Sequence, residues 1–125
     1  MSFQRHDLLT AIRGADADGN LATTGDPLWN SLANTPADPS YPGAHSVISA
    51  AGATVLTSFF GPDDTITVNS EALPGVVRSF RSYQGVREEA GLSRIYAGVH
   101  TRIDHLAGER LGTAVAHDVL KHAFS

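Results

Sequence analysis

The feature that most constrains this chain is a run of apolar and small residues that extends without a charge from Ser46 to Phe60. The run reads Ser-Val-Ile-Ser-Ala-Ala-Gly-Ala-Thr-Val-Leu-Thr-Ser-Phe-Phe. Such a segment predicts a helix that is buried on most of its sides. Gly61 and Pro62 follow directly and predict where this helix ends. The fold is therefore expected to be built around this helix.

Two further helices are predicted from the spacing of apolar residues. The first set recurs at offsets of three and four and consists of Leu73, Val76, Val77, Phe80 and Tyr83. It predicts a helix over about residues 73–96, with Gly85 as a candidate kink. The second set forms one stripe of a helix over about 101–123 and consists of Ile103, Leu106, Ala107, Leu111, Ala114, Val115 and Val119. Strand signals are scarce, with residues 65–68 at most a short strand, so the predicted fold class is an all-α helical bundle.

The chain is expected to form a single domain over residues 1–125, with a helical core over 45–125. Residues 1–44 are expected to be an irregular N-terminal segment with a short helix, because residues 14–44 are rich in Gly, Pro, Asp, Asn and Thr. Asp16, Asp18 and Asn20 alternate as at the start of a calcium-binding loop. The glycine and the bidentate glutamate of such a loop are missing, so a plain turn is the better interpretation.

Composition excludes several classes of protein. The formal net charge is −4 and no run of Lys and Arg is present, which argues against a nucleic-acid surface. There are no cysteines, so disulfides and thiolate metal sites are excluded. No segment reaches the roughly 18–20 uninterrupted apolar residues of a membrane span. The N-terminus has the character of neither a signal nor a transit peptide, and we expect a cytoplasmic protein.

One constellation of residues indicates chemistry on a tetrahedral oxyanion. Arg94 lies six residues before His100, and Asp104 lies four residues after it. On a helix, residues four apart share a face, so the Asp104 carboxylate can fix the tautomer of the His100 ring and leave its other nitrogen nucleophilic or free to ligate. The Arg94 guanidinium matches phosphate or vanadate. His45 opens the apolar helix, where backbone N–H groups suit an anion and an imidazole can donate a proton.

Each of these residues also has an ordinary structural interpretation. Arg94 could pair with Glu88 or Glu89, and Asp104 could be a carboxylate favoured by the helix dipole. For each residue taken singly, the structural interpretation is at least as good as the functional one. The order and spacing of the residues together favour a functional site. The remaining histidines lack such spacing and are interpreted as solvated or satisfied residues: His6, His105, His117 and His122.

The segment around His45 and the segment from Ser93 to Asp104 resemble the family that joins type 2 phosphatidic acid phosphatases and bacterial acid phosphatases with vanadium-dependent haloperoxidases. The family motif S-R-x5-H-x3-D is matched in full by Ser93, Arg94, His100 and Asp104. The motif P-S-G-H is matched in part by Pro42, Gly43, Ala44 and His45. The resemblance is to the bacterial haloperoxidase-related branch and extends over residues 9–120. It implies a bundle similar to the C-terminal part of the acid phosphatase and haloperoxidase fold.

The resemblance also implies roles for these residues. His100 would attack phosphorus in a phosphatase or be the axial metal ligand of vanadate in a haloperoxidase, and vanadate is the cofactor implied. His45 would be the general acid, Arg94 would hold oxygens of the anion, and Asp104 would orient His100. Gly43 and Ala44 occupy the positions of the P-S-G-H motif beside the anion. The implied partner is a small oxyanion or a phosphomonoester.

The chain departs from the family pattern at its first motif, K-x6-R-P. Asp7 stands where the arginine belongs, Leu8 stands at the proline, and the lysine would precede Met1. Gly43 also replaces the serine of the second motif. Since each charge-assisted hydrogen bond contributes about 1.5–3 kcal/mol, losing three contacts predicts a large loss of affinity or rate.

The expected function is therefore a phosphoesterase-related or haloperoxidase-like oxyanion binder with weak or no activity, and whether it is an enzyme stays open. One alternative is a structural or binding remnant of the family without turnover. Another is a half-site completed by a partner chain. A helical remnant with so apolar a central helix is expected to form a homo-oligomer, most simply a symmetric dimer.

Overall fold

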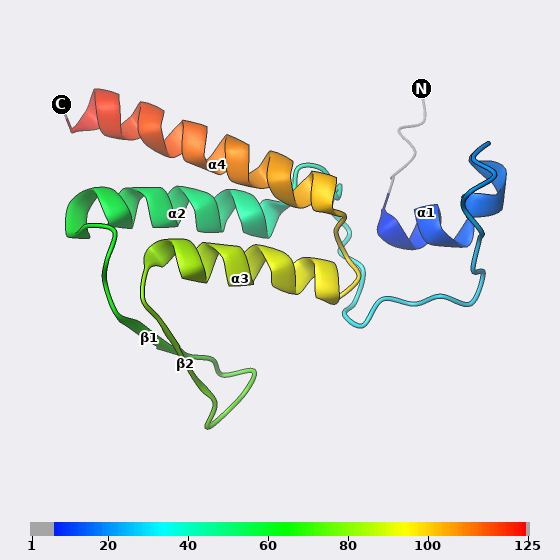
Figure 1. Ribbon diagram of the computed structural model, residues 1–125, viewed down its shortest axis with the longest axis horizontal. Coiled ribbons are helices and arrows are strands. Elements are labelled where there is room, and N and C mark those ends of the chain that lie inside the picture. Colours follow the sequence, from blue (N-terminus) through cyan, green and yellow to red (C-terminus); the bar gives the residue numbers. More distant parts are fainter. Residues whose placement is uncertain (1–6, 125) are drawn as a thin grey trace.

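The predicted helical bundle is confirmed by the computed structural model, which describes residues 7–124. Three long helices lie side by side, with α2 (Ala44–Phe60) between α3 (Tyr83–Tyr96) and α4 (Arg102–Ala123) (Figure 1). A two-stranded hairpin, β1 (Ile66–Asn69) and β2 (Val77–Phe80), extends from the bundle beside α3. No helix in the described range is both long enough and apolar enough to cross a membrane.

The central helix α2 ends where the sequence predicts, with Gly61 at φ 91° as its C-cap. Its buried residues are small or hydroxylated and comprise Ser46, Ala50, Ala53 and Thr54. The prediction that this helix is buried on most sides is wrong, because α3 and α4 cover only part of it. Ile48 is 73% exposed and Phe59 is 57% exposed, although both lie in the apolar run.

Helix α4 packs against α2 through small residues. A Cβ atom built on Gly112 would lie 2.1 Å from the Val47 carbonyl oxygen, and one on Gly108 would lie 2.5 Å from that of Gly43. These two glycines, with Ala116, are buried along the face of α4 that meets α2. The backbones can therefore approach closely because side chains are absent from this face. The apolar stripe seen in the sequence stays largely exposed instead, with Ile103 at 70%.

Adding a methyl group at Gly112 is expected to destabilise the chain. Alanine favours a helix over glycine by about 0.5–1 kcal/mol, but the overlap with Val47 should outweigh this and give a net loss of about 1–3 kcal/mol. Gly52→Ala in α2 is the matched control, because its Cβ would have no neighbour within 4 Å. Urea unfolding should show Gly52→Ala stabilised and Gly112→Ala destabilised. Equal stability of the two variants would contradict this helix packing.

The third helix begins later than predicted. Residues 73–82 form a turn and strand β2, which pairs with β1 in an antiparallel register that places Ile66 opposite Phe80. Pro74 and Gly75, the latter at φ 81°, interrupt the spacing that had suggested a helix. Helix α3 starts instead after Ser82, whose hydroxyl accepts the Gly85 N–H at 3.1 Å. Gly85 therefore belongs to the first turn and is not a kink.

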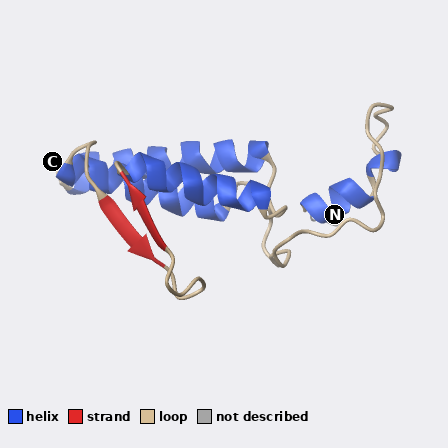
Figure 2. Cartoon of the chain, turned by 60° about the horizontal axis from the view of Figure 1, so that its bottom comes forward, coloured by secondary structure: helices blue, strands red, loops and turns tan. Residues whose placement is uncertain are grey.

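The N-terminal segment lies beyond one end of the bundle (Figure 2). It contains α1 (Leu8–Arg13) and a short 3-10 helix, η1 (Ala15–Ala17), followed by a long irregular stretch. Asp18 accepts the Asn20 N–H at 2.7 Å, as in the plain turn predicted for this region. The Leu32 N–H donates to the Ala97 carbonyl at 2.9 Å, which holds the segment against the connection between α3 and α4.

Candidate functional site

The site residues meet at the end of the bundle where α2 begins, α3 ends and α4 begins. His45 is the second residue of α2, Arg94 lies in the last turn of α3, and His100 lies just before α4. A cavity of about 90 Å³ opens here. It is lined by Asp7, Thr35, Pro36, Asp38, Pro39, Ser40, Ala44, His45, Val99 and His100. The structure thus brings both histidines to one pocket from positions far apart in the sequence.

Hydrogen bonds at the starts of α2 and α4 hold this arrangement. The Gly43 N–H donates to the Asp104 carbonyl at 2.9 Å, which joins the two helix starts directly. The first turn of α4 has a capping box, in which Thr101 Oγ1 accepts the Asp104 N–H at 3.2 Å and Asp104 Oδ2 accepts the Thr101 N–H at 2.7 Å. Gly43 and Asp104 thus lie behind the pocket and do not line it.

His100 is buried, with 5% of its surface exposed. Its Nδ1 atom lies 3.7 Å from Asp104 Oδ2, which is in ion-pair range but longer than the hydrogen bond expected from the sequence. The reason is that the same oxygen is engaged by the Thr101 N–H of the capping box. His100 Nδ1 has no hydrogen-bond partner within residues 7–124. Asp104 therefore serves both the helix cap and the electrostatic environment of the His100 ring.

Arg94 lies close enough to influence His45. Partial burial of His45 lowers its pKa below the usual 6.5, and the nearby charges of Arg94 and His100 lower that pKa further. Arg94 Nε is buried without a hydrogen-bond partner in the described part of the chain, and Arg94 forms no ion pair there with Glu88 or Glu89. The structural alternative for Arg94 is therefore not observed, and its charge acts on His45, although Arg94 is not among the residues that line the cavity.

The pKa of His45 should respond to Arg94. Because that pKa is lowered, the midpoint of the ring's titration should lie below the ordinary value for histidine. Replacing Arg94 with glutamine removes one of the causes and should move the midpoint upward, toward the ordinary value. Histidine titration by NMR measures this midpoint directly. An unchanged midpoint in Arg94→Gln would show that the guanidinium is not beside His45.

Carboxylates line the same pocket as the histidines. Asp7 is the N-cap of α1 and accepts the Thr10 N–H at 2.6 Å, and Asp38 comes from the irregular stretch. Asp7 is the residue that the sequence aligns with a missing family arginine, and it does lie in the pocket with His45 and His100. The pocket lining therefore carries negative charge as well as the two histidines. Within the described residues, no cluster of three or more His, Cys, Asp or Glu is arranged to hold a metal ion.

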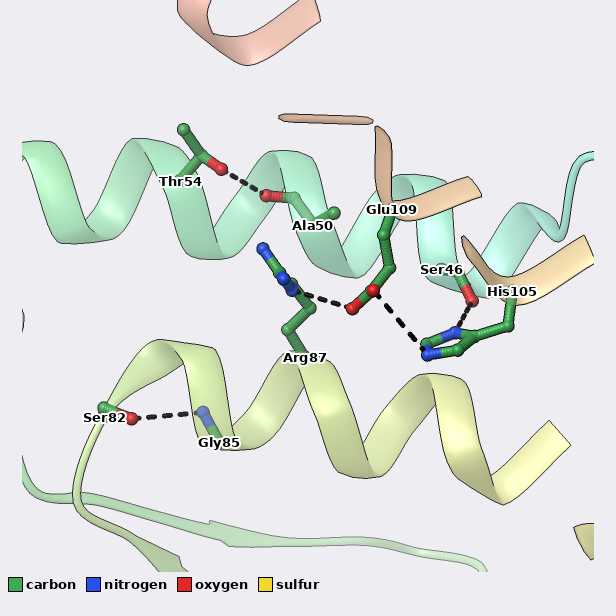
Figure 3. A network of polar contacts seen from close by, with 8 residues as sticks. All are labelled: Ser46, Ala50, Thr54, Ser82, Gly85, Arg87, His105 and Glu109. Atoms are coloured by element: carbon green, nitrogen blue, oxygen red, sulfur yellow. Dashed lines mark hydrogen bonds and ion pairs between the residues drawn. The ribbon is translucent and has the colours of Figure 1, made fainter. Parts of the chain in front are cut away.

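The other histidines divide into two kinds. His117 and His122 are exposed, as predicted, and His6 lies outside the described residues. The interpretation of His105 is incomplete, because this histidine is only 6% exposed and its Nδ1 lies 2.8 Å from Ser46 Oγ (Figure 3). A signal for it was available in the sequence: Ser46 directly follows His45, and His105 directly follows Asp104.

The fold is a helical bundle with a pocket at one end that His45 and His100 line, and with Arg94 close to His45. The family model described as "VCPO second helical-bundle domain" matches residues 3–125. The chain therefore belongs to this family, within the vanadium haloperoxidase superfamily. No curated protein sequence matches it.

Solved structures agree with this assignment. The structure titled as the first bacterial vanadium-dependent iodoperoxidase shares 34% identity, with a TM-score of 0.72 over 77% of this chain and 24% of that chain. The holo form of a bacterial vanadium-dependent chloroperoxidase shares 19% identity, with a TM-score of 0.66 over 92% of this chain and 30% of that chain. Its apo form gives a TM-score of 0.65. The second likeness shows the fold alone, and the chain spans less than a third of the length of either protein.

Proposed function

We propose that the pocket binds a tetrahedral oxyanion, either vanadate as a haloperoxidase-like protein or phosphate as a related phosphoesterase. The observation that carries this proposal is the convergence of His45, Arg94 and His100 at one end of the bundle. One buried nitrogen atom there, Arg94 Nε, has no partner in the described residues. Buried donors are ordinarily satisfied, so an unpartnered one near a cavity favours a bound anion.

Each residue has a role that follows from its position. His100 Nδ1 faces the Asp104 carboxylate, which leaves Nε2 as the atom to bind vanadium or to attack phosphorus. Arg94 would neutralise the oxygens of the anion. When bound, vanadate supplies a Lewis-acidic centre that activates hydrogen peroxide toward a halide. His45 lines the pocket and would transfer a proton to the leaving oxygen of a phosphomonoester, or hold a proton beside a bound vanadate.

The negative charge of the pocket lining predicts that binding and turnover are weak. Asp7 and Asp38 place carboxylates in a pocket that would receive a multiply charged anion. The negative charge that builds on the transferring group would be poorly stabilised, and this electrostatic contribution is usually the largest in such catalysis.

The proposal is tested by titrating the full chain with phosphate and with vanadate by calorimetry. We expect saturable binding with a dissociation constant of about 0.1–1 mM, roughly 4–5.5 kcal/mol. Arg94→Gln should weaken it about tenfold or more, because it removes the only permanent cation of the set. Hydrolysis of p-nitrophenyl phosphate, and bromide oxidation with vanadate and peroxide, then distinguish the two activities. Binding that Arg94→Gln leaves unchanged would overturn the site.

A second candidate is a half-site that a second copy of the chain completes. The specific observation is the apolar surface left uncovered among the described residues, which includes Ile48 on α2 and Ile103 and Val115 on α4, at 73%, 70% and 49% exposure. Surfaces of this kind mark interfaces more often than solvent-facing sides. A structural remnant without turnover is the third candidate and would show the same surface with no oxyanion binding.

The oligomeric state distinguishes the second candidate. We expect light scattering at micromolar concentration to show a symmetric homodimer, because the exposed apolar faces gain from burial against each other. Ile48→Glu should shift the population toward monomer. A monodisperse monomer of the unmodified chain would contradict this expectation and leave the site to a single copy.

A further inference from the structure

A polar network of buried and partly buried side chains links the three helices (Figure 3). Ser46 Oγ on α2 lies 2.8 Å from His105 Nδ1 on α4. The other ring nitrogen, Nε2, lies 3.8 Å from Glu109 Oε2, and Glu109 Oε1 accepts from Arg87 Nε of α3 at 2.9 Å. Ser46 and His105 are 2% and 6% exposed, so this hydrogen bond is sealed from solvent. None of the four side chains lines the oxyanion pocket.

The network lies next to the pocket residues along the chain. Ser46 directly follows His45, and His105 directly follows Asp104. Arg87 precedes Arg94 by seven residues, which is about two helical turns and places both near one face of α3. On α2 and α4 the linking side chains are therefore direct sequence neighbours of His45 and Asp104, whereas on α3 Arg87 lies two turns from Arg94.

Close packing against α3 restricts where the His105 ring can lie. A Cβ atom on Gly91 would lie 2.2 Å from His105 Cε1, so the ring rests directly against the backbone of α3. A Cβ atom on Gly108 would lie 2.8 Å from the Cβ of Ser46, which shows how closely the two helices approach at the bond. With Nε2 protonated toward the Glu109 carboxylate, Nδ1 is the acceptor for the Ser46 hydroxyl.

We propose that the Ser46–His105 hydrogen bond is a positioning contact that sets where His45 lies relative to His100. This inference rests on the proposed function, because the purpose of such positioning is to hold one oxyanion between the two rings. A buried side-chain hydrogen bond contributes directionality that contact between small residues lacks, and here it adds to the Gly43–Asp104 backbone bond that joins the two helix starts. Breaking the bond should therefore change the pocket as well as the stability of the chain.

The first test compares two hydroxyl deletions on α2. Ser46→Ala removes the link between helices, whereas the control Thr54→Val removes a buried hydroxyl that bonds only within α2, donating to the Ala50 carbonyl at 2.7 Å. Calorimetry with inorganic phosphate should show affinity falling about fivefold for Ser46→Ala and less than about twofold for Thr54→Val. Backbone NMR signals of Val99 and His100, which are remote in sequence from both changes, should shift only in Ser46→Ala.

The second test uses the two amide replacements for a histidine. In His105→Asn the amide lies near the position of Nδ1 and can keep the bond to Ser46, whereas in His105→Gln it lies near the position of Nε2 and keeps only the contact with Glu109. We expect His105→Asn to retain phosphate affinity within about twofold and His105→Gln to lose as much as Ser46→Ala. This pair of variants also tests the positioning role of the hydrogen bond if Ser46→Ala fails to fold.

The outcomes separate the two proposals. If the unmodified chain binds neither phosphate nor vanadate, the proposed function fails, and the Val99 and His100 signals alone decide whether the contact positions the pocket. Equal effects of Ser46→Ala and Thr54→Val on these signals, or of His105→Asn and His105→Gln, would overturn the positioning role and leave a structural hydrogen bond.

Discussion

Replacing His100 with alanine is expected to abolish oxyanion binding and any turnover that the chain has. The His100 ring is buried, lines the pocket, and has the Asp104 carboxylate 3.7 Å from its Nδ1 atom. No other side chain described in the pocket offers a nitrogen with a carboxylate behind it. Losing one group that stabilises charge in such a site costs about a hundredfold or more. Phosphate titration and assays with p-nitrophenyl phosphate, and with vanadate, peroxide and bromide, measure the loss.

Two controls accompany this substitution. His122→Ala removes a histidine whose side chain is 66% exposed at the far end of α4, and it should change neither binding nor turnover. His100→Asn fills more of the buried space than alanine and tests whether packing alone matters. Retained activity in both His100 variants would show that this histidine is not the ligand or nucleophile.

Removing the negative charge at Asp7 is expected to give the largest gain in phosphate affinity. Asp7→Asn keeps an N-cap for α1, because asparagine also caps helices, and it takes one carboxylate out of the pocket. One charge several ångströms from a bound anion is worth about 1–2 kcal/mol near a protein surface, so phosphate affinity should rise about tenfold. Asp7→Arg restores the family's residue type and should raise it further.

Asp26→Asn is the matched control, since it changes net charge equally at an exposed position outside the pocket. An equal gain from Asp26→Asn would show a general charge effect and would remove Asp7 from the site. Gly43→Ser, the other return to the family motif, is a less clean test. A Cβ atom there would lie 3.1 Å from the Asp104 carbonyl oxygen, so crowding would oppose any gain from the hydroxyl.

The sequence predicts those elements whose signals are local. The long run of residues 46–60 and its glycine stop define α2 to within two residues, and Thr101 with Asp104 forms the cap that starts α4. Helix α3 is predicted ten residues too early because strand β2 depends on pairing with β1, and such pairing leaves no mark in the spacing of one segment.

Burial is harder to predict than the helices themselves. The apolar stripe of α4 suggests one packed face, but the face that meets α2 carries Gly108 and Gly112, whose contribution is the absence of a side chain. His105 carries no motif of its own; its place beside Asp104 is visible in the sequence, but its hydrogen bond depends on Ser46, 59 residues away. The motif spacing identifies His45, Arg94 and His100, whereas the place of Asp38 in the pocket depends on an irregular stretch that no periodicity describes.

The proposed site holds one oxyanion between His45 and His100 with the help of Arg94. The most direct measurement is NMR of the isotope-labelled full chain during titration with vanadate, with the histidine ring signals and the arginine Nε signals recorded together. We predict saturable shifts with one common dissociation constant at His45, Arg94 and His100, and none at His117. Absence of saturable shifts, or shifts that map to another part of the chain, would contradict the assignment of this pocket.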